Sequence, residues 1–445
     1  MKDFMQENLA GRSTAVVQGW CPTGWRPMQA QDGWIVRIRP HCASVSAEQW
    51  LVLAELALSH AHPEIELTRL GNVQLRGVSE AHLSTVHSAL LQAHLLPADA
   101  DVDQAPAVHC TPFYRLGDPT HALAVLLTQT VQTQLSPKAL HGRGLEAMPS
   151  KFGLVVDDSR RRMSGMGADL CLWVGDDGRY GLGLGDCGHG YGFDKVDDAV
   201  AAAVNAALWF AQKRRAFTPA PTRLKKLQIP DALDLPCLNQ AERFSDGPGL
   251  AEAERTGPIP PGLLQDGSRV MGAPLGRIDA AAMHRVMRHM PSQAEIRVTP
   301  WRSLVFDAKS LACQIAAAEP AYWIAQADDA RLRVSACTGA PRCTQALVSV
   351  QELALWLAPQ VPEKAHLHLS ACAKCCALPP EATAVLLAVA GADHQITESA
   401  DPATSQVVFH VCSPDRIANP VAQISPQALS NKPSQISKLI YDLHI

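Results

Sequence analysis

Five cysteines lie within forty residues near the C-terminal end of the chain. The run ACTGAPRC contains Cys337 and Cys343, and SACAKCC contains Cys372, Cys375 and Cys376. The whole chain of 445 residues has 13 cysteines, so a stretch of this length should hold about one. Thiolates are soft ligands that select zinc, copper(I) or an iron–sulfur cluster over magnesium or calcium. The enrichment therefore predicts a metal-binding set of cysteines.

The spacing of these cysteines bears on the choice of metal. Structural zinc sites usually have two to four residues between paired cysteines, whereas five residues separate Cys337 from Cys343. A Cys-x5-Cys loop followed by Cys-x3-Cys resembles the [4Fe-4S] site of the sulfite and nitrite reductase superfamily. This resemblance implies four cluster ligands: Cys337, Cys343, Cys372 and Cys376. Related sequences carry a small residue where this chain has Cys375, so CAKCC offers two possible fourth ligands: Cys376, which keeps the family spacing, and Cys375, which stays open as an alternative. Zinc and buried, unligated thiols are the other interpretations.

Length and composition describe an ordinary globular protein of two to four domains, with 47% apolar and 18% charged residues. No run of 18 apolar residues occurs, and the N-terminus lacks the apolar stretch of a secretory signal. We therefore expect a cytoplasmic protein with reduced thiols and no membrane partner. A net charge of −4 argues against nucleic-acid binding, so any anionic ligand would need a local basic pocket.

One strand–helix–strand pattern occurs twice along the chain. The first copy comprises the strand DGWIVRIRP, a helix that begins after Ser46, and a second strand, IELTRLGNVQLRGV. The later copy comprises RVMGAPLGRI, a helix that begins after Asp279, and the strand EIRVTPWRSLVF. Ser46 and Asp279 are good helix N-caps, and Gln49 completes a capping box in the first copy. The repeat predicts an internally duplicated α+β protein.

Six sequence blocks carry a family resemblance. In order, they are GWCPTGWRPMQAQDGWIVRIRP, LTRLGNVQLRGV, MPSKFGLVVDD, IRVTPWR, ACTGAPRC and HLSACAKCC. Together they resemble the precorrin-3B synthase family, a member of the sulfite and nitrite reductase superfamily. The likeness extends over about residues 14–395.

The resemblance implies a duplicated fold of two ferredoxin-like half-domains and two larger α/β domains. The expected boundaries are half-domain 1 at 14–90, the first reductase-like α/β domain at 105–216, a Pro-rich linker at 217–266, half-domain 2 at 267–322, the [4Fe-4S]-binding α/β domain at 323–412 and a tail at 413–445.

The resemblance also implies an activity. Family members are oxygen-dependent monooxygenases of aerobic cobalamin biosynthesis, which hydroxylate precorrin-3A and form a lactone from an acetate side chain. They carry a [4Fe-4S] cluster, take electrons from NADH through a separate reductase, and use a non-haem iron whose ligands this sequence does not identify. Two alternatives stay open: a sirohaem-dependent sulfite or nitrite reductase, and a non-catalytic tetrapyrrole-binding protein.

Precorrin-3A is a tetrapyrrole edged with carboxylates, and arginine binds carboxylates with two parallel hydrogen bonds. The expected substrate-binding residues in the matched blocks are Arg37, Arg39, Arg69, Asn72, Gln74, Arg76, Lys151, Trp301 and Arg302.

Two departures from the family pattern bear on this set. Arg69 stands one place earlier than the usual arginine, so on a continuous strand it would face away from the pocket. Gly153 replaces a second lysine of the reductases, which weakens the case for sirohaem.

Two weaker motifs also occur in the sequence. Gly183, Gly185 and Gly188 spell GxGxxG, but they lie in a hairpin-like segment instead of a strand–turn–helix unit, so we do not expect NADH to bind there. His366 and His368 alternate on the strand before Cys372 and could reach an iron together, although a structural role is the commoner one for such a pair.

Overall fold

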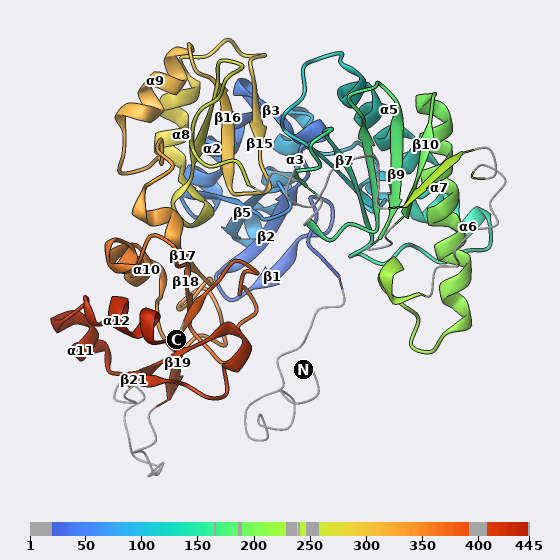
Figure 1. Cartoon of the computed structure of the whole chain (residues 1–445). Helices are drawn as coiled ribbons and strands as arrows, with labels where there is room; N and C mark the ends of the chain where they lie inside the picture. The colour runs from blue at the N-terminus through green and yellow to red at the C-terminus, as the bar shows by residue number, and fades with distance from the viewer. Residues whose placement is uncertain are drawn as a thin grey trace.

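The computed structural model describes residues 20–163, 166–185, 189–227, 238, 241–245, 258–390 and 407–443. These residues form four β-sheets with helices packed against them. In Figure 1, the two half-domains lie side by side, the first α/β domain extends to the right, and the second lies below. No helix among the described residues is both long enough and apolar enough to span a lipid bilayer.

The two half-domain sheets have the same strand pattern. The first contains β1 (Met28–Ala30), β2 (Gly33–Ile38), β5 (Val73–Val78) and β4 (Glu64–Leu67), covered by α2 (Ala47–His60). The second contains β12 (Gly262–Leu263), β13 (Ser268–Gly272), β16 (Ser303–Asp307) and β15 (Glu295–Val298), covered by α8 (Ala280–Met287) and α9 (Leu311–Ala318). Ser46 and Asp279 cap α2 and α8 as the sequence predicts, and the capping box with Gln49 is complete.

Each half-domain gives its edge strand to the other. β14 (Arg277–Asp279) pairs with β4, and β3 (Ser44–Ser46) pairs with β15. The paired centres, Ile278 with Ile65 and Val45 with Ile296, are fully buried. The two half-domains therefore share one hydrophobic core, and the duplicated α+β fold is confirmed.

The expectation of one continuous strand after each helix is wrong. In the first copy the chain reverses at Thr68–Asn72 between β4 and β5, and in the second at Thr299–Ser303 between β15 and β16. The threonine Oγ1 accepts a backbone N–H bond from Asn72 or Ser303, and Gly71 (φ 67°) and Arg302 (φ 58°) take the left-handed conformation that closes each turn.

The two α/β domains repeat a second topology. The first contains β6 (Ala107–Cys110), β7 (Gly153–Asp157), β8 (Leu170–Val174), β9 (Tyr180–Leu184), β10 (His189–Phe193) and β11 (Glu242–Ser245), with α5 (Pro119–Gln134) and α7 (Val196–Lys213) among its helices. The second contains β17 (Val334–Ala336), β18 (Leu367–Ser370), β19 (Ala384–Ala390), β20 (Val407–Cys412) and β21 (Ala422–Ile424), with α10 (Gln351–Leu357). In both sheets the first three strands are parallel and the next pairings are antiparallel.

The predicted tail at 413–445 is part of the second α/β domain. β21 pairs with β20, and α11 (Pro426–Asn431) and α12 (Gln435–Asp442) bury Leu429, Ile436 and Ile440. The prolines had suggested a segment outside the core, but Pro426 occupies the first turn of a helix, where proline is tolerated. The predicted linker 217–266 likewise contributes β11 to a sheet, although much of it lies outside the described residues.

Candidate functional site

The cysteines follow two neighbouring strands of the second α/β domain. Cys337 comes directly after β17, and Cys372 lies two residues beyond β18. Because β17 and β18 are parallel, their carboxyl ends meet at one edge of the sheet. The Ala371 N–H donates to Cys337 Sγ at 3.2 Å, as backbone amides do around thiolate ligands. The fold thus brings both predicted pairs to one edge.

Cys376 is the exposed member of the predicted ligand set, and its thiol itself is partly covered. Burial raises the pKa of its thiol, and the nearby Cys337, Cys372 and Cys343 raise it further. The interaction of one thiol with the other three places them in a common group.

Cys375 lies differently. Its left-handed backbone (φ 45°) directs a buried side chain into a small apolar cluster with Val385, Leu387 and Cys412. Burial raises the pKa of Cys375, a hydrogen bond with Ser370 lowers it, and the charges of Cys372, Cys337 and Cys376 raise it further. The local geometry therefore favours Cys376 over Cys375 as the fourth ligand.

The donor set fits an iron–sulfur cluster. A single zinc would draw its sulfurs to about 3.8 Å from one another, as its tetrahedral bonds require. A [4Fe-4S] cluster spreads four cysteines over a larger object. Within the described ranges, no group of three or more His, Cys, Asp or Glu side chains could hold one metal ion. The described residues thus do not fit the non-haem iron that the resemblance implies.

The first half-domain supports the cysteine loop. The Arg76 guanidinium donates to the Arg342 carbonyl at 2.8 Å and to Asp32 at 2.6 Å, and Arg342 in turn pairs with Glu64 at 2.7 Å. Arg342 is the residue before Cys343. Arg76, expected to bind substrate, therefore holds the loop between the first two cysteines.

A cavity of about 800 Å³ lies where the half-domains meet both α/β domains. Its walls come from both hairpin turns, the loop after β7, the start of β17 and the segment that follows Cys376. Its polar side chains include four arginines, one tryptophan and one histidine: Arg69, Arg162, Arg302, Arg331, Trp301 and His366. Glu381 is the single carboxylate among the described lining residues. The cavity is therefore basic, although the chain as a whole is slightly acidic.

The four arginines differ in how they are neutralised. Arg331 makes a bidentate pair with Asp329 at 2.6 and 2.9 Å, and Arg162 pairs with Asp158. Arg69 lies 3.5 Å from Glu381.

The Arg302 side chain bonds to no group in the described part of the chain, and its Nε is buried without an acceptor. Burial, followed by the charge of Arg69, lowers the pKa of Arg302 to about 10. A Cβ on Gly276 would come 2.5 Å from Arg302 Cδ, so the side chain passes over this glycine. Among the cavity's side chains, Arg302 is therefore the best candidate to bind an anionic group of a ligand.

Trp301 offers an aromatic face beside these charges. The ring is half-buried and stacks on Phe113, with centroids 6.1 Å apart and planes 21° apart. Arg162 lies over the same phenylalanine at 5.3 Å from its centroid. Tetrapyrrole rings stack readily on such surfaces.

Arg69 was expected to face away from the pocket if it lay on a continuous strand. It lies instead in the turn between β4 and β5, and its side chain lines the cavity. The other expected substrate residues lie elsewhere. Arg37 donates to Gln74 at 2.9 Å on the first half-domain sheet, Arg39 donates to the carbonyls of Asp103 and Ala105, and Lys151 is exposed outside the cavity lining.

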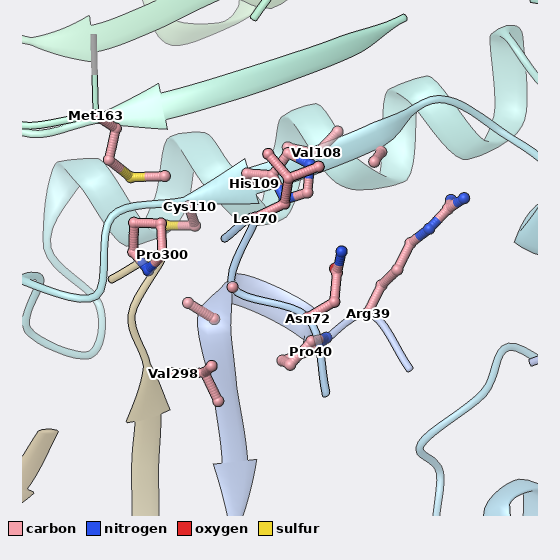
Figure 2. Close-up of a pocket in the computed structure, with 13 residues that line it drawn as sticks. Arg39, Pro40, Leu70, Asn72, Val108, His109, Cys110, Met163, Val298 and Pro300 are labelled. Atoms are coloured by element: carbon pink, nitrogen blue, oxygen red, sulfur yellow. The ribbon is translucent and has the colours of Figure 1, made fainter. Parts of the chain in front are cut away.

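Asn72 lines a second, much smaller pocket of about 20 Å³, the volume of roughly one water. Figure 2 shows it between Arg39, His109 and Pro300. Burial, and then the charge of Arg39, lowers the pKa of His109 to about 4. The duplication relates Gly71 and Asn72 here to Arg302 and Ser303 in the large cavity. The two related positions therefore differ sharply in the space they offer.

His366 and His368 are joined through one hydroxyl. Ser335 Oγ on β17 lies 3.0 Å from His366 Nε2 and 2.9 Å from His368 Nδ1. Ser335 and His366 line the large cavity, whereas His368 is fully buried and its Nε2 has no partner. Burial, then the charge of Arg69, lowers the pKa of His368 to about 3. Burial also lowers the pKa of His366 from its usual value, so both rings are neutral at physiological pH.

We expect His368 to destabilise the fold in acid. An unfolded histidine titrates near pH 6.5, so between about pH 6.5 and 3 the unfolded chain binds a proton that the folded chain does not, and stability falls as the pH falls. Between pH 7 and 5 this amounts to about 2 kcal/mol. In urea titrations, the free energy of unfolding of His368→Asn should fall between pH 7 and 5 by about 2 kcal/mol less than that of the wild type. Identical pH dependences in both proteins would contradict the prediction.

Sequence reasoning missed four residues of the site: Arg162, Arg331, Ser335 and Glu381. Arg162 and Glu381 lie in loops, Arg331 lies in a short 3-10 helix (Ala330–Arg333) and Ser335 lies in β17, and only tertiary contacts bring them to the cavity. Of the weaker motifs, Gly183 lies in β9, Gly185 lies in the turn after it and Gly188 lies outside the described residues, so the described part of GxGxxG belongs to a β-hairpin.

Comparisons with known proteins agree with this arrangement. The nitrite/sulfite reductase ferredoxin-like half domain matches residues 27–93. Precorrin-3B synthase of Sinorhizobium sp is 27% identical over 388 residues, which cover 83% of this chain and 80% of that protein. The structure of Mycobacterium tuberculosis NirA matches with a TM-score of 0.56 at 14% identity, covering 91% of this chain and 80% of NirA, a likeness of fold alone. These similarities confirm the resemblance inferred from the sequence blocks: the chain is similar to precorrin-3B synthase over most of its length and has the duplicated fold of the sulfite and nitrite reductases.

Proposed function

We propose that this protein catalyses the oxygen-dependent hydroxylation of precorrin-3A and the closure of its lactone, in aerobic cobalamin biosynthesis. The observation that carries the proposal is the basic cavity of about 800 Å³ next to the cysteine centre, in a chain similar to precorrin-3B synthase. Its volume is within the usual range for small-molecule sites, and its arginines suit a carboxylate-edged macrocycle.

The residues of the chain have separable parts in this activity. Arg302 and Arg69 bind peripheral carboxylates, and Trp301 supports one face of the macrocycle. The apolar walls formed by Ile259, Ile324 and Leu332 exclude water from the other side. Binding at several carboxylates fixes the ring in one orientation, so that a single ring carbon is presented for reaction.

The cysteine centre would supply electrons. A [4Fe-4S] cluster held by Cys337, Cys343, Cys372 and Cys376 transfers single electrons when bound. Ser335 lines the cavity two residues before Cys337, a separation of about 7 Å along the strand. The overall reaction places one oxygen atom of O2 in the product and releases the other as water, and it consumes two electrons and two protons. NADH, acting through a separate reductase, is the proposed source.

The test is an anaerobic incubation of the cluster-loaded protein with precorrin-3A and a reductant, followed by a pulse of oxygen. We expect a product one oxygen atom heavier, with label from ¹⁸O₂, that carries the lactone. Binding of precorrin-3A without any oxygen-dependent product would instead support a non-catalytic tetrapyrrole-binding protein.

A sirohaem-dependent sulfite or nitrite reductase is the alternative that the fold neighbour keeps open. Two observations count against it. Lys151 is exposed and does not line the cavity, and Gly153, in place of a second lysine, pairs its backbone with Ala107 in the sheet. Sirohaem absorption in the purified protein, together with reduction of sulfite or nitrite, would favour the alternative.

A further inference from the structure

Glu381 is the carboxylate that lies beside Arg69 on the cavity wall. It lies between Cys376 and β19, and its Oε1 is 3.5 Å from Arg69 Nη2 on the cavity wall. The Glu381 side chain is 56% exposed and the Arg69 side chain is 34% exposed, so the ion pair is accessible to water and its contact distance is long. Such pairs contribute little stability and are easily exchanged for another partner.

Arg302 adds a second cation to the same place. Its guanidinium has no partner in the described chain, and its Nε is enclosed without an acceptor. The charge of Arg69 acts unfavourably on Arg302, whereas the charge of Glu381 acts favourably. Two guanidinium groups therefore face one carboxylate, and this leaves hydrogen-bonding capacity for a second anion.

His366 supplies a neutral donor to the group. A proton on His368 Nε2 would be an enclosed donor without an acceptor. His368 thus carries its proton on Nδ1 and donates to Ser335, whose hydroxyl donates to His366 Nε2. The remaining proton of His366 is then on Nδ1, which bonds to no described group.

We propose that Arg302, Arg69 and His366 form a subsite for one substrate carboxylate, and that Glu381 competes with that carboxylate for Arg69. This inference rests on the proposed function. Only the Glu381 side chain needs to move, because its backbone segment is anchored where Thr383 N donates to the His366 carbonyl at 2.9 Å and His366 N donates to Thr383 Oγ1 at 2.9 Å.

Glu381 would act as a specificity determinant. A ligand with a carboxylate at this position gains Arg69, Arg302 and His366 together. A ligand without a carboxylate at this position leaves Arg69 paired with Glu381. Its edge is then buried beside the Arg302 guanidinium, which stays without an acceptor. The competition therefore favours the fully carboxylated macrocycle over partly decarboxylated ones.

The test is a fluorescence titration of the cluster-loaded, full-length protein with uroporphyrin, a tetrapyrrole with eight carboxylates. Glu381→Gln should bind it about threefold to tenfold more tightly, because the competing charge is removed. Glu363→Gln makes the same charge change at an exposed position outside the cavity lining and should leave the affinity within about twofold. In an Arg69→Gln background, the gain from Glu381→Gln should be mostly lost.

The outcomes separate this inference from the proposed function. Equal affinities for wild type and Glu381→Gln, or equal gains for Glu381→Gln and Glu363→Gln, would overturn the competition while leaving the cavity as the binding site. A gain that persists without Arg69 would also overturn it. No uroporphyrin binding by any of these proteins would overturn both proposals.

Discussion

Cys376→Ala should abolish cluster assembly, whereas Cys375→Ala should retain it. Cys376 is exposed and interacts with the other three predicted ligands, while Cys375 packs among Val385, Leu387 and Cys412. Alanine cannot bind iron, and a [4Fe-4S] cluster that lacks one of four thiolates is usually lost. We expect about four iron atoms per chain in wild type and Cys375→Ala, and fewer than about one in Cys376→Ala.

Iron analysis after anaerobic purification, with the visible spectrum, measures this directly. Cys375→Ala is the matched control, because it removes one thiol from the same turn. It should lower stability only slightly, since it removes one sulfur from a small apolar cluster. The opposite pattern, with iron lost from Cys375→Ala and kept by Cys376→Ala, would reverse the assignment of the fourth ligand. Loss from both would show that the turn itself is required.

Arg302→Gln should weaken uroporphyrin binding about 10-fold to 150-fold. Hydrogen bonds to a charged group contribute about 1.5–3 kcal/mol, and 1.4 kcal/mol corresponds to a factor of ten. Arg302 combines a place on the cavity wall with a guanidinium that no described group neutralises, so a ligand carboxylate would be its main partner. Glutamine keeps a neutral amide donor group and much of the side-chain volume, which limits damage to the turn.

Arg288→Gln is the matched control for this substitution. Arg288 is exposed at the end of α8 and lies outside the cavity lining, so the same loss of charge should change the affinity less than twofold. Similar losses in both variants would mean that the protein attracts the porphyrin through overall charge alone. Thermal unfolding of both variants checks that Arg302→Gln has kept the fold.

Local signals account for the parts of the fold that were predictable. Ser46 and Asp279 mark helix starts through their own side chains, so the duplication could be found from the sequence. The turns at Thr68–Asn72 and Thr299–Ser303 were missed because the apolar residues before and after each turn fall on the same alternate positions, as they would in one strand. Gly71 was a usable signal, but its counterpart Arg302 gave none, because arginine seldom adopts a positive φ.

The site was less predictable than the fold. Arg69, Trp301 and Arg302 were proposed from the family blocks and do line the cavity, but Arg37, Arg39 and Arg76 bond to groups of the protein itself. Nothing local distinguishes the two groups, since both lie in or beside half-domain strands. Which arginine meets a protein acceptor depends on segments far away in sequence, such as the Arg342 carbonyl that Arg76 reaches across 266 residues.

The exchanged edge strands bear on how the chain folds during synthesis. β4 remains an unpaired edge until residues 277–279 leave the ribosome, more than two hundred residues later, and β3 must wait still longer for β15. An exposed strand edge is a site of aggregation, and pairings between distant residues form slowly. The N-terminal half should therefore depend on chaperones while the rest is made, and a chain truncated before residue 277 should accumulate in insoluble form.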